Sequence, residues 1–412
     1  MTFPLKIVGL LKSKGEKILV TVTPTTSFTV GFNLTFTGSI DIDFKEGAGK
    51  EALTSGVEKT NLYGVAATYI IEITGDLTNI TKFIADSSRI TTISNLKTGL
   101  LTDFQIWGNL YAGNLDMSNA PISGAFYTFG NSGLTSITHS LTGNSITSIY
   151  RVENCNITGV HDLSNVPVSG TLWINNNTNF TGFNFATSGN GTLNSLRVNS
   201  TDIASLDLSN NPITGTLWAN TCTLLTSLTF ATSGNGKLNN LRLYGSDITG
   251  TLDFSNMPIS ATVWCNSNSN LTGLIFSTTG NTLVTFFDFT NCNISTLDLT
   301  NVPIGTSFRM NGNSSFSTIT FAAAANGSLS DFNVATCNLP NTDFSVFPTS
   351  DGVTITYVSN SLTATEHDNQ LINLDGTGWI NGSLLIIAGN TARTAASDTA
   401  YNNLISNGWT IT

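Results

Sequence analysis

The feature that most constrains the fold is a short phrase that returns at an almost constant interval. Residues 206–213 read LDLSNNPI, and the proline of this phrase recurs after 46, 45, 46, 45 and 45 residues, with an aspartate five residues before it each time. A period of this length is typical of a solenoid, in which each unit completes its core only by stacking on its neighbours. The prolines are Pro121, Pro167, Pro212, Pro258, Pro303 and Pro348, and the aspartates are Asp116, Asp162, Asp207, Asp253, Asp298 and Asp343.

Each repeat divides further into four short β segments of about eleven residues. In one repeat the segments are residues 196–198, 206–208, 217–219 and 228–230, and each has an apolar, polar, apolar pattern. Alternate side chains of a strand point to opposite faces, so this pattern buries one side of every segment. The sequence therefore predicts a mainly β fold whose largest part, residues 76–348, is a parallel β solenoid with two turns per repeat.

The first and third segments of each repeat resemble the leucine-rich repeat pattern LxxLxLxxNxL, as residues 193–203 (LNSLRVNSTDI) illustrate. The resemblance implies an inward Asn or Asp that hydrogen-bonds the bending backbone, because buried backbone groups at a solenoid corner need partners. We interpret these residues as a structural ladder without a chemical role. Its expected members are Asn156, Asp202, Asp247, Asn293 and Asn338.

The two ends of the chain depart from the repeat. Residues 18–22, 28–36, 40–44 and 68–74 alternate apolar and polar side chains and predict a small β-sandwich over residues 1–75. Residues 363–374 and 395–405 have helical spacing, and segments 383–388 and 409–412 are expected strands. We interpret residues 349–412 as an α/β cap, since an uncovered solenoid end would expose strand edges and core.

The outward residue of each first and third segment follows from position alone. Stacked parallel strands lie about 4.8 Å apart, so arginines and tryptophans are expected to interleave at cation–π distance, each contact contributing roughly 0.5–1 kcal/mol. The candidate binding face consists of Tyr127, Arg151, Trp173, Arg197, Trp218, Arg242, Trp264 and Arg309, in a row that also includes Gln105, Asp288 and Asn333.

The opposite sheet is expected to present an acidic and hydroxylic row. The aspartates of this row recur only in every second turn, roughly 10 Å apart, which is too far for one cation to bridge. Solvation and edge protection are the simpler interpretation. The row consists of Asp116, Thr138, Asp162, Asn184, Asp207, Thr229, Asp253, Ile275, Asp298, Thr320 and Asp343.

No residue pattern indicates catalysis, a metal or a cofactor. The three histidines lack metal-ligand spacing, and neither a nucleophile elbow nor a phosphate-binding loop occurs. Five cysteines form no CxxC pair, and three of them share one repeat position with a threonine and a serine, which indicates a need for a small side chain. The histidines are His139, His161 and His367, and that shared position holds Cys155, Thr201, Ser246, Cys292 and Cys337.

Charge and the N-terminal segment limit the partners. Lys and Arg number 16 against 26 Asp and Glu, a net charge of −10 that argues against nucleic acid. Residues 1–20 contain no apolar run long enough for a signal peptide or a membrane span, so no membrane insertion is expected. For the arginine–tryptophan face three interpretations stay open: stabilisation of the solenoid itself, docking of a protein, and stacking of a glycan.

The residues also resemble known families. IDIDFKEGAGKE followed by TNLYGVAATYIIEITG is similar to immunoglobulin-like domains of the PKD type, although residues 44–47 (FKEG) replace the WGDG signature. The repeats resemble those of BspA-like leucine-rich-repeat surface proteins, and together with the ending AYNNLISNGWTIT they resemble virion proteins of phages that infect Bacteroidetes. Such proteins act in attachment and not in catalysis.

The resemblance implies a non-enzymatic fibre, spike or appendage on a virion surface, bound to other virion proteins and to a host-surface protein or glycan, with a homo-oligomer among the options. One alternative is a bacterial cell-surface adhesin. Another is a glycan-cleaving tailspike, an enzyme that would need an irregular acidic cleft in place of a regular aspartate row.

Overall fold

The protein is described from a computed structural model that covers residues 16–24, 27–47, 49–85 and 88–412. The chain divides into two compact units, Met1–Ser145 and Ile146–Thr412. Of the N-terminal segment 1–20, in which no signal peptide is expected, residues 1–15 lie outside the described residues.

The first unit begins with an antiparallel sheet of five strands. Burial alternates strictly along β1, because every second side chain faces the core. The strands predicted at residues 18–22, 40–44 and 68–74 are present here within a residue or two of the expected bounds. In spatial order the sheet contains β4 (Glu51–Ala52), β3 (Ile40–Asp43), β6 (Tyr69–Gly75), β1 (Lys17–Val22) and β8 (Ile90–Ser94).

A second sheet of this unit changes from antiparallel to parallel pairing. Strand β2 (Phe28–Phe36) pairs antiparallel with both β5 (Glu58–Tyr63) and β7 (Ile80–Ile84). A short 3-10 helix, η1 (Leu77–Asn79), directly precedes β7 in the chain. From β7 onward the pairing is parallel, first to β9 (Leu101–Gln105) and then to β11 (Ile122–Tyr127). The parallel stacking of the repeats therefore begins at β7. The separate pair β10 (Ala112–Asp116) and β12 (Gly133–Thr138) is also parallel.

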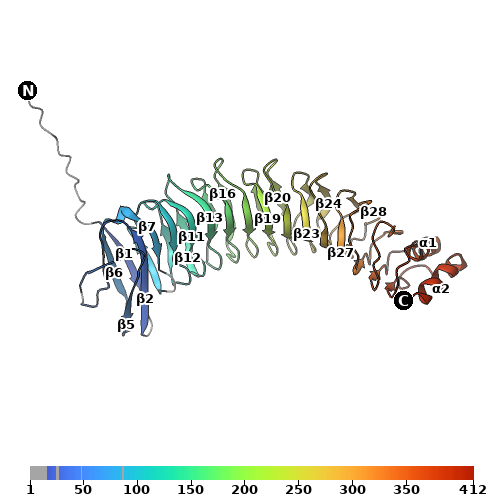
Figure 1. Ribbon diagram of the computed structural model, residues 1–412, viewed down its shortest axis with the longest axis horizontal. Helices are drawn as coiled ribbons and strands as arrows, with labels where there is room; N and C mark the ends of the chain where they lie inside the picture. The colour runs from blue at the N-terminus through green and yellow to red at the C-terminus, as the bar shows by residue number, and fades with distance from the viewer. Residues whose placement is uncertain (1–15, 25–26, 48, 86–87) are drawn as a thin grey trace, which may run out of the picture. The chain divides into compact units, whose positions relative to one another are not determined.

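The second unit is built on one continuous parallel sheet, whose strands lie side by side in Figure 1 as successive rungs. Each strand pairs with the strand two elements further along the chain, as a coiled chain requires. The mainly β fold and the parallel β solenoid are thus confirmed. The rungs are β13 (Ser145–Arg151), β15 (Gly170–Trp173), β17 (Leu193–Arg197), β19 (Ile213–Trp218), β21 (Leu238–Arg242), β23 (Ile259–Trp264), β25 (Val284–Asp288), β27 (Ile304–Arg309) and β29 (Asp331–Asn333).

The opposite face of this unit is not the continuous sheet that the sequence pattern suggested. Its strands pair only two by two, so each 45-residue repeat contributes one separate two-stranded sheet. The pairs are β14 (Gly159–Leu163) with β16 (Phe180–Phe185), β18 (Ser205–Leu208) with β20 (Ser227–Phe230), β22 (Gly250–Phe254) with β24 (Leu271–Phe276), and β26 (Thr296–Leu299) with β28 (Thr318–Phe321).

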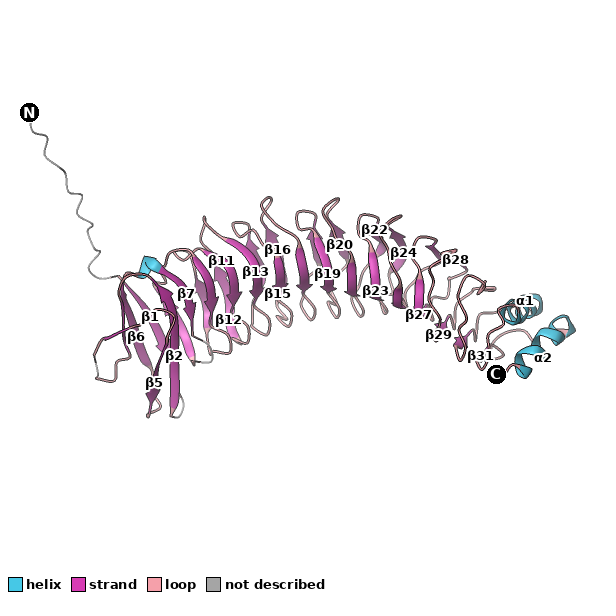
Figure 2. Ribbon diagram, viewed as in Figure 1, coloured by secondary structure: helices cyan, strands magenta, loops and turns pink. Residues whose placement is uncertain are grey.

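In the last turns of the solenoid, helices take the place of the strands opposite the main sheet (Figure 2). The predicted helices are present as α1 (Ala364–Asp375), which a capping box of Thr363 and Glu366 begins, and as η2 (Ala395–Ser397) continued by α2 (Asp398–Ser406). The main sheet does not stop at residue 348, because three more parallel strands continue it. These strands are β30 (Thr354–Thr356), β31 (Ser383–Leu385) and β32 (Thr410–Ile411).

The recurring proline has a structural explanation at the turn of the next rung. A glycine in the left-handed region lies against the ring of Pro121, Pro167, Pro212 and Pro258, as Gly234 does with a φ of 78° on Pro212. A Cβ atom at Gly234 would lie 3.1 Å from the proline ring, and the positive φ also disfavours a side chain, although Ala325 adopts a φ of 67° at the equivalent turn. The proline and the glycine of successive turns are therefore a matched pair.

Buried asparagines satisfy the backbone at one corner of the coil. Asn268 is fully buried, donates from Nδ2 to the carbonyls of Leu243 (3.0 Å) and Cys265 (2.7 Å), and accepts at Oδ1 from the amide of Ile248 (3.0 Å). Its side chain thus joins successive turns, which supplies the partners that buried amides and carbonyls need. The same three-bond pattern is made by Asn109, Asn131, Asn177, Asn313 and Asn360.

The ladder predicted from the leucine-rich pattern was therefore placed one residue too late. In residues 193–203 the N of LxxLxLxxNxL falls on Thr201, which is 3 % exposed and donates to the Val198 carbonyl at 2.7 Å. Asp202, by contrast, is not inward. The predicted members are half-buried or exposed, and two of them pair with asparagines of the next turn at the surface. These residues are Asn156, Asp202, Asp247, Asn293 and Asn338.

We expect Asn268→Ala to lower the free energy of unfolding by at least about 3 kcal/mol, because three buried backbone groups lose their partners. Asn268→Cys should cost less, since Cys222 occupies this corner in the preceding repeat and donates to the Val198 carbonyl. Urea unfolding followed by circular dichroism measures both. The control is Asn270→Ala, a surface change next to it, expected within about 0.5 kcal/mol of wild type. Equal midpoints for Asn268→Ala and Asn270→Ala would contradict the assignment.

Candidate binding face

The outward residues of the main sheet form a column in the second unit, which we call the Arg/Trp column. Strand register places each member directly beside the next, from Arg151 opposite Trp173 to Arg242 opposite Trp264. The predicted interleaving is thus present. The column consists of Arg151, Trp173, Arg197, Trp218, Arg242 and Trp264, and continues through Asp288, Arg309 and Asn333.

The guanidinium groups stack directly on the indole rings. The Arg197 Cζ lies 3.8 Å from the ring centroid of Trp173 and 3.9 Å from that of Trp218. Arg151 covers the other face of Trp173 at 4.6 Å, and Arg242 covers the other face of Trp218 at 4.3 Å. Both faces of these two rings are therefore occupied from within the chain. A sugar ring has no free indole face to stack on at either position.

The column is half-buried along its length, so it is less exposed than an isolated surface row would be. Burial lowers the pKa of Arg197, and the positive charges of Arg151 and Arg242 lower it further, while the Glu153 carboxylate raises it. The Trp173 indole donates to the Ser195 hydroxyl at 2.9 Å. The stacking distances and this hydrogen bond support the interpretation that the column stabilises the solenoid, whereas the burial of the Arg197 charge works against it.

Ion pairs lie at the two ends of the column and not in its middle, where the Glu153 carboxylate acts on Arg197 without a direct pair. Arg151 forms an ion pair with Glu153, which is 3 % exposed, and the Arg309 Nε lies 2.5 Å from an Asp331 oxygen. Among the residues that the structure describes, neither Arg197 nor Arg242 forms an ion pair. The centre of the column therefore carries two positive charges in a chain whose net charge is −10.

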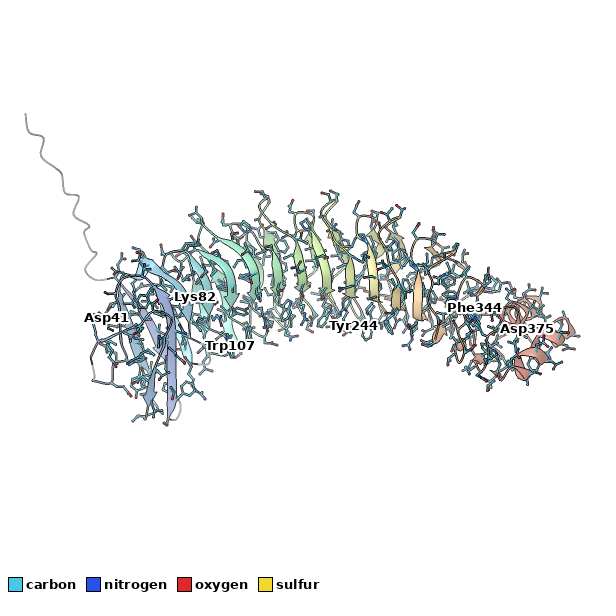
Figure 3. All side chains as sticks on the ribbon, in the orientation of Figure 1. Asp41, Lys82, Trp107, Tyr244, Phe344 and Asp375 are labelled. Atoms are coloured by element: carbon cyan, nitrogen blue, oxygen red, sulfur yellow. The ribbon has the colours of Figure 1, made fainter. Side chains whose placement is uncertain are left out.

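The remaining member of the predicted face lies in the first unit. Tyr127 is in register with Gln105 and is half-buried, with its ring 6.4 Å from that of Phe129. Tyr244, labelled in Figure 3, was not predicted as part of the face. It lies two residues after Arg242 and stacks on Trp264 at a centroid distance of 4.5 Å. The aromatic contacts of the face thus extend one residue beyond the predicted row.

The aspartate row on the opposite face has a local structural role. Each carboxylate accepts a hydrogen bond from the backbone amide two residues later, as Asp207 does from Ser209 at 2.9 Å. Such side-chain bonds stabilise the turn that ends the strand. They account for the recurrence of aspartate without any ligand. The same bond is made by Asp116, Asp162, Asp253, Asp298 and Asp343.

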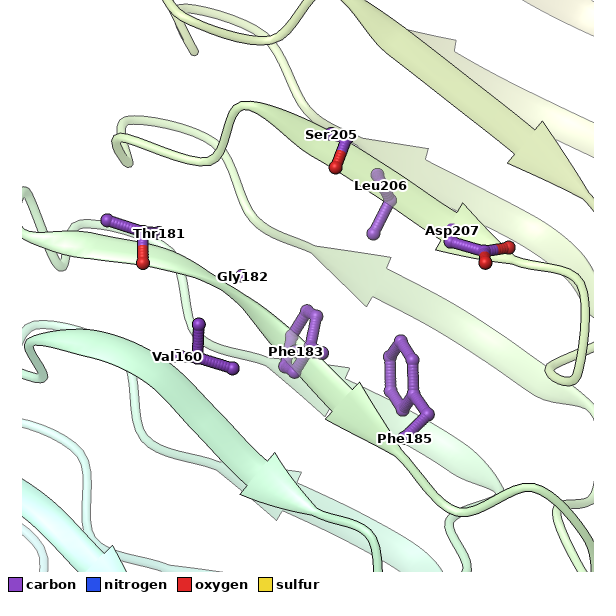
Figure 4. Close-up of a pocket in the computed structure, with 8 residues that line it drawn as sticks. All are labelled: Val160, Thr181, Gly182, Phe183, Phe185, Ser205, Leu206 and Asp207. Atoms are coloured by element: carbon purple, nitrogen blue, oxygen red, sulfur yellow. The ribbon is translucent and has the colours of Figure 1, made fainter.

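A shallow pocket opens on this face where β16 and β18 are not hydrogen-bonded to one another (Figure 4). Phe183 and Phe185 form its apolar floor together with Leu206, and Asp207 lies at its rim. Its volume of about 180 Å³ is below the roughly 300–1,000 Å³ of typical small-molecule sites. Its only carboxylate, that of Asp207, already caps the strand end. The pocket follows from the gap between strand pairs.

Two sets of residues with potential chemistry are placed in the core instead of a site. His161, on β14, is 3 % exposed, and its Nε2 lies 2.5 Å from the Tyr150 hydroxyl. Burial lowers the pKa of His161 to about 4, so the imidazole is neutral at pH 7. The five cysteines carry free thiols, and within the described ranges no group of three or more His, Cys, Asp or Glu side chains could hold a metal ion.

Comparisons with protein-family models, with curated proteins and with solved structures found no match for this chain. A search of the described helices found none with the length and apolar character needed to cross a membrane.

We expect Trp218→Ala to lower the free energy of unfolding by about 2 kcal/mol. The substitution removes two cation–π contacts of roughly 0.5–1 kcal/mol each and the packing of a half-buried indole ring. It also removes the side chain that separates the positive charges of Arg197 and Arg242. Trp218→Phe is the matched control, because it keeps a ring and removes an indole N–H that is buried without a hydrogen-bond partner. It should stay within about 1 kcal/mol of wild type in urea unfolding. A Trp218→Ala protein as stable as wild type would contradict the stabilising role of the column.

We expect the protein to lose stability as the pH falls from about 6.5 to about 4. The folded protein holds the pKa of His161 at about 4, below the usual 6.5 of the unfolded chain, so the unfolded state binds more protons in this window. The loss is roughly 3 kcal/mol from this group. The double variant Tyr150→Phe/His161→Leu should lose less stability between pH 7 and pH 4 in thermal melts. Tyr150→Phe alone keeps the imidazole and should retain the wild-type dependence, and identical pH profiles for all three proteins would contradict this origin.

Proposed function

We propose that the protein is a non-enzymatic structural component of a virion, a fibre, spike or appendage that attaches the particle to a host surface or decorates it. The observation that carries this proposal is the Arg/Trp column. A repeating sheet holds a regular row of large side chains at fixed spacing, and arginine and tryptophan are residue types enriched at binding hot spots. A row of this kind suits repeated contact with an extended partner better than it suits a reaction.

The finer description of the fold belongs to the same proposal. We propose that residues 1–75 form a PKD-like, immunoglobulin-like sandwich, that residues 76–348 are leucine-rich repeats, and that residues 349–412 cap the solenoid. The burial of Thr201 and Ile203 at the N and last L of LxxLxLxxNxL supports the second assignment. Antiparallel pairing of β1 with β6 and of β2 with β5 supports the first.

Two other functions give different expectations. A bacterial cell-surface adhesin would use the same solenoid and the same column, with its location on a cell envelope in place of a particle. A glycan-cleaving tailspike would need two carboxylates in unlike environments at a cleft. The aspartates of the opposite face are instead repeated in one environment, each bonded to the backbone amide two residues later. This regularity favours attachment over cleavage.

We expect antibodies raised against the purified protein to label phage particles by immunogold electron microscopy, at a fibre, spike or other appendage. Particles and intact bacterial cells from one culture that carries the gene are compared on the same grids. Label on the cell envelope without label on particles would replace the virion assignment with the adhesin. A fall in the viscosity of a polysaccharide solution incubated with the protein would contradict a non-enzymatic role.

A further inference from the structure

We propose that the centre of the Arg/Trp column, from Trp173 to Arg242, binds the carboxylate groups of a linear acidic polysaccharide that lies along the solenoid axis. This inference deepens the proposed attachment function and rests on it. It assigns the chemical class of the partner from the charges, spacing and flanking residues of the column.

The first argument is the unbalanced charge at the centre. Arg197 and Arg242 are fixed between indole faces, yet no carboxylate is paired with either of them in the described part of the chain. The Nε of Arg242 donates to the Asn240 side chain at 3.2 Å, and the Nε of Arg197 is buried without a hydrogen-bond partner. Guanidinium forks that are already ordered lose little freedom on binding a carboxylate.

The second argument is the spacing. Arg197 and Arg242 lie on strands separated by one rung, so the two charges repeat after about 10 Å along the axis. Trp218 stands between them and prevents them from approaching one another. A ligand that satisfies both must therefore carry anionic groups at a similar interval along an extended polymer. A single small anion can reach only one of them.

The third argument is the chemistry on both sides of the central rungs. The outward residues two positions before the column are hydroxyl or amide side chains, and so are those two positions after it, just beyond the ends of β15 and β17. None of them carries a charge, and the corresponding position after Arg242 holds the aromatic Tyr244. They are Thr171, Ser195, Thr216 and Asn240 on one side and Asn175 and Asn199 on the other, whereas Asn220 is buried.

These flanks favour a polysaccharide over a protein partner. A protein hot spot needs a desolvated apolar pocket around its anchor residue, whereas the side chains beside Arg197 are hydroxyl and amide groups. Ring hydroxyls of a sugar can instead exchange hydrogen bonds with hydroxyl and amide side chains while its carboxylates meet the arginines. Neutral glycans are disfavoured, because both faces of Trp173 and Trp218 are covered by guanidinium groups.

The test is titration calorimetry of the full chain with polygalacturonate, neutral dextran and dextran sulfate. We expect binding to polygalacturonate that weakens as salt is added, since the contacts are charge-assisted, and no binding to dextran. Arg197→Gln/Arg242→Gln should weaken binding at least tenfold, whereas Arg197→Lys/Arg242→Lys should retain part of it. The control Lys237→Gln/Arg309→Gln removes two positive charges that lie outside the centre, one of them already paired with Asp331. Its affinity for polygalacturonate should stay within threefold of wild type.

Four results would overturn the inference: no binding of polygalacturonate by the wild-type protein, wild-type affinity in the Arg197→Gln/Arg242→Gln protein, an equal loss in the control, or binding of dextran sulfate without polygalacturonate. Circular dichroism melts accompany each variant. If the double glutamine variant shows no folding transition, the single Arg242→Gln variant takes its place, with an expected loss of at least threefold. Failure of all polygalacturonate binding would leave immunogold labelling of particles unaffected, so the two proposals fail separately.

Discussion

The structure depends on satisfying the backbone where the chain turns from one face of the solenoid to the other. At these corners amides and carbonyls point inward, and an unpaired buried group costs about 1–3 kcal/mol. The Asn177, Asn268 and Asn313 side chains each serve one amide and two carbonyls there, so they join neighbouring turns as well as closing their own. Stacking in fixed register, and with it the Arg/Trp column, follows from this repeated bonding.

The strands, the period and the register of the outward rows could be predicted from the sequence, because alternation and a constant repeat length determine them. The corner ladder could not be placed correctly, because the residue that fills it changes from turn to turn. Asn177 is followed by Thr201, Cys222 and Ser246, and each donates a hydrogen bond to a backbone carbonyl. Similarity of size was visible in the sequence, but the shared donor function is recognised only once the carbonyls are located.

The candidate face shows the same division. Sequence spacing predicts which residues lie side by side, but it does not determine how side chains share the space between rungs. The 3.8 and 3.9 Å distances of Arg197 from two indole rings depend on rotamers and close packing. Likewise, the aspartate row had a visible period, but its bonds to backbone amides two residues later depend on the turn geometry, as with Asp253 and Ser255. Consequently, the row that looked acidic is largely a row of turn caps.

In the proposed polysaccharide binding, stability and recognition use different parts of the same side chains in this column. The flat faces of Trp218, Arg197 and Arg242 stack on one another, and this stacking stabilises the solenoid and fixes the positions of the side chains. What remains for a partner is the rim of each guanidinium, with its charge and directed N–H groups. A surface of this kind discriminates by charge and spacing more than by apolar contact area. Because the spacing of the strands sets the interval between the charges, it also sets the interval that the proposed partner has to match.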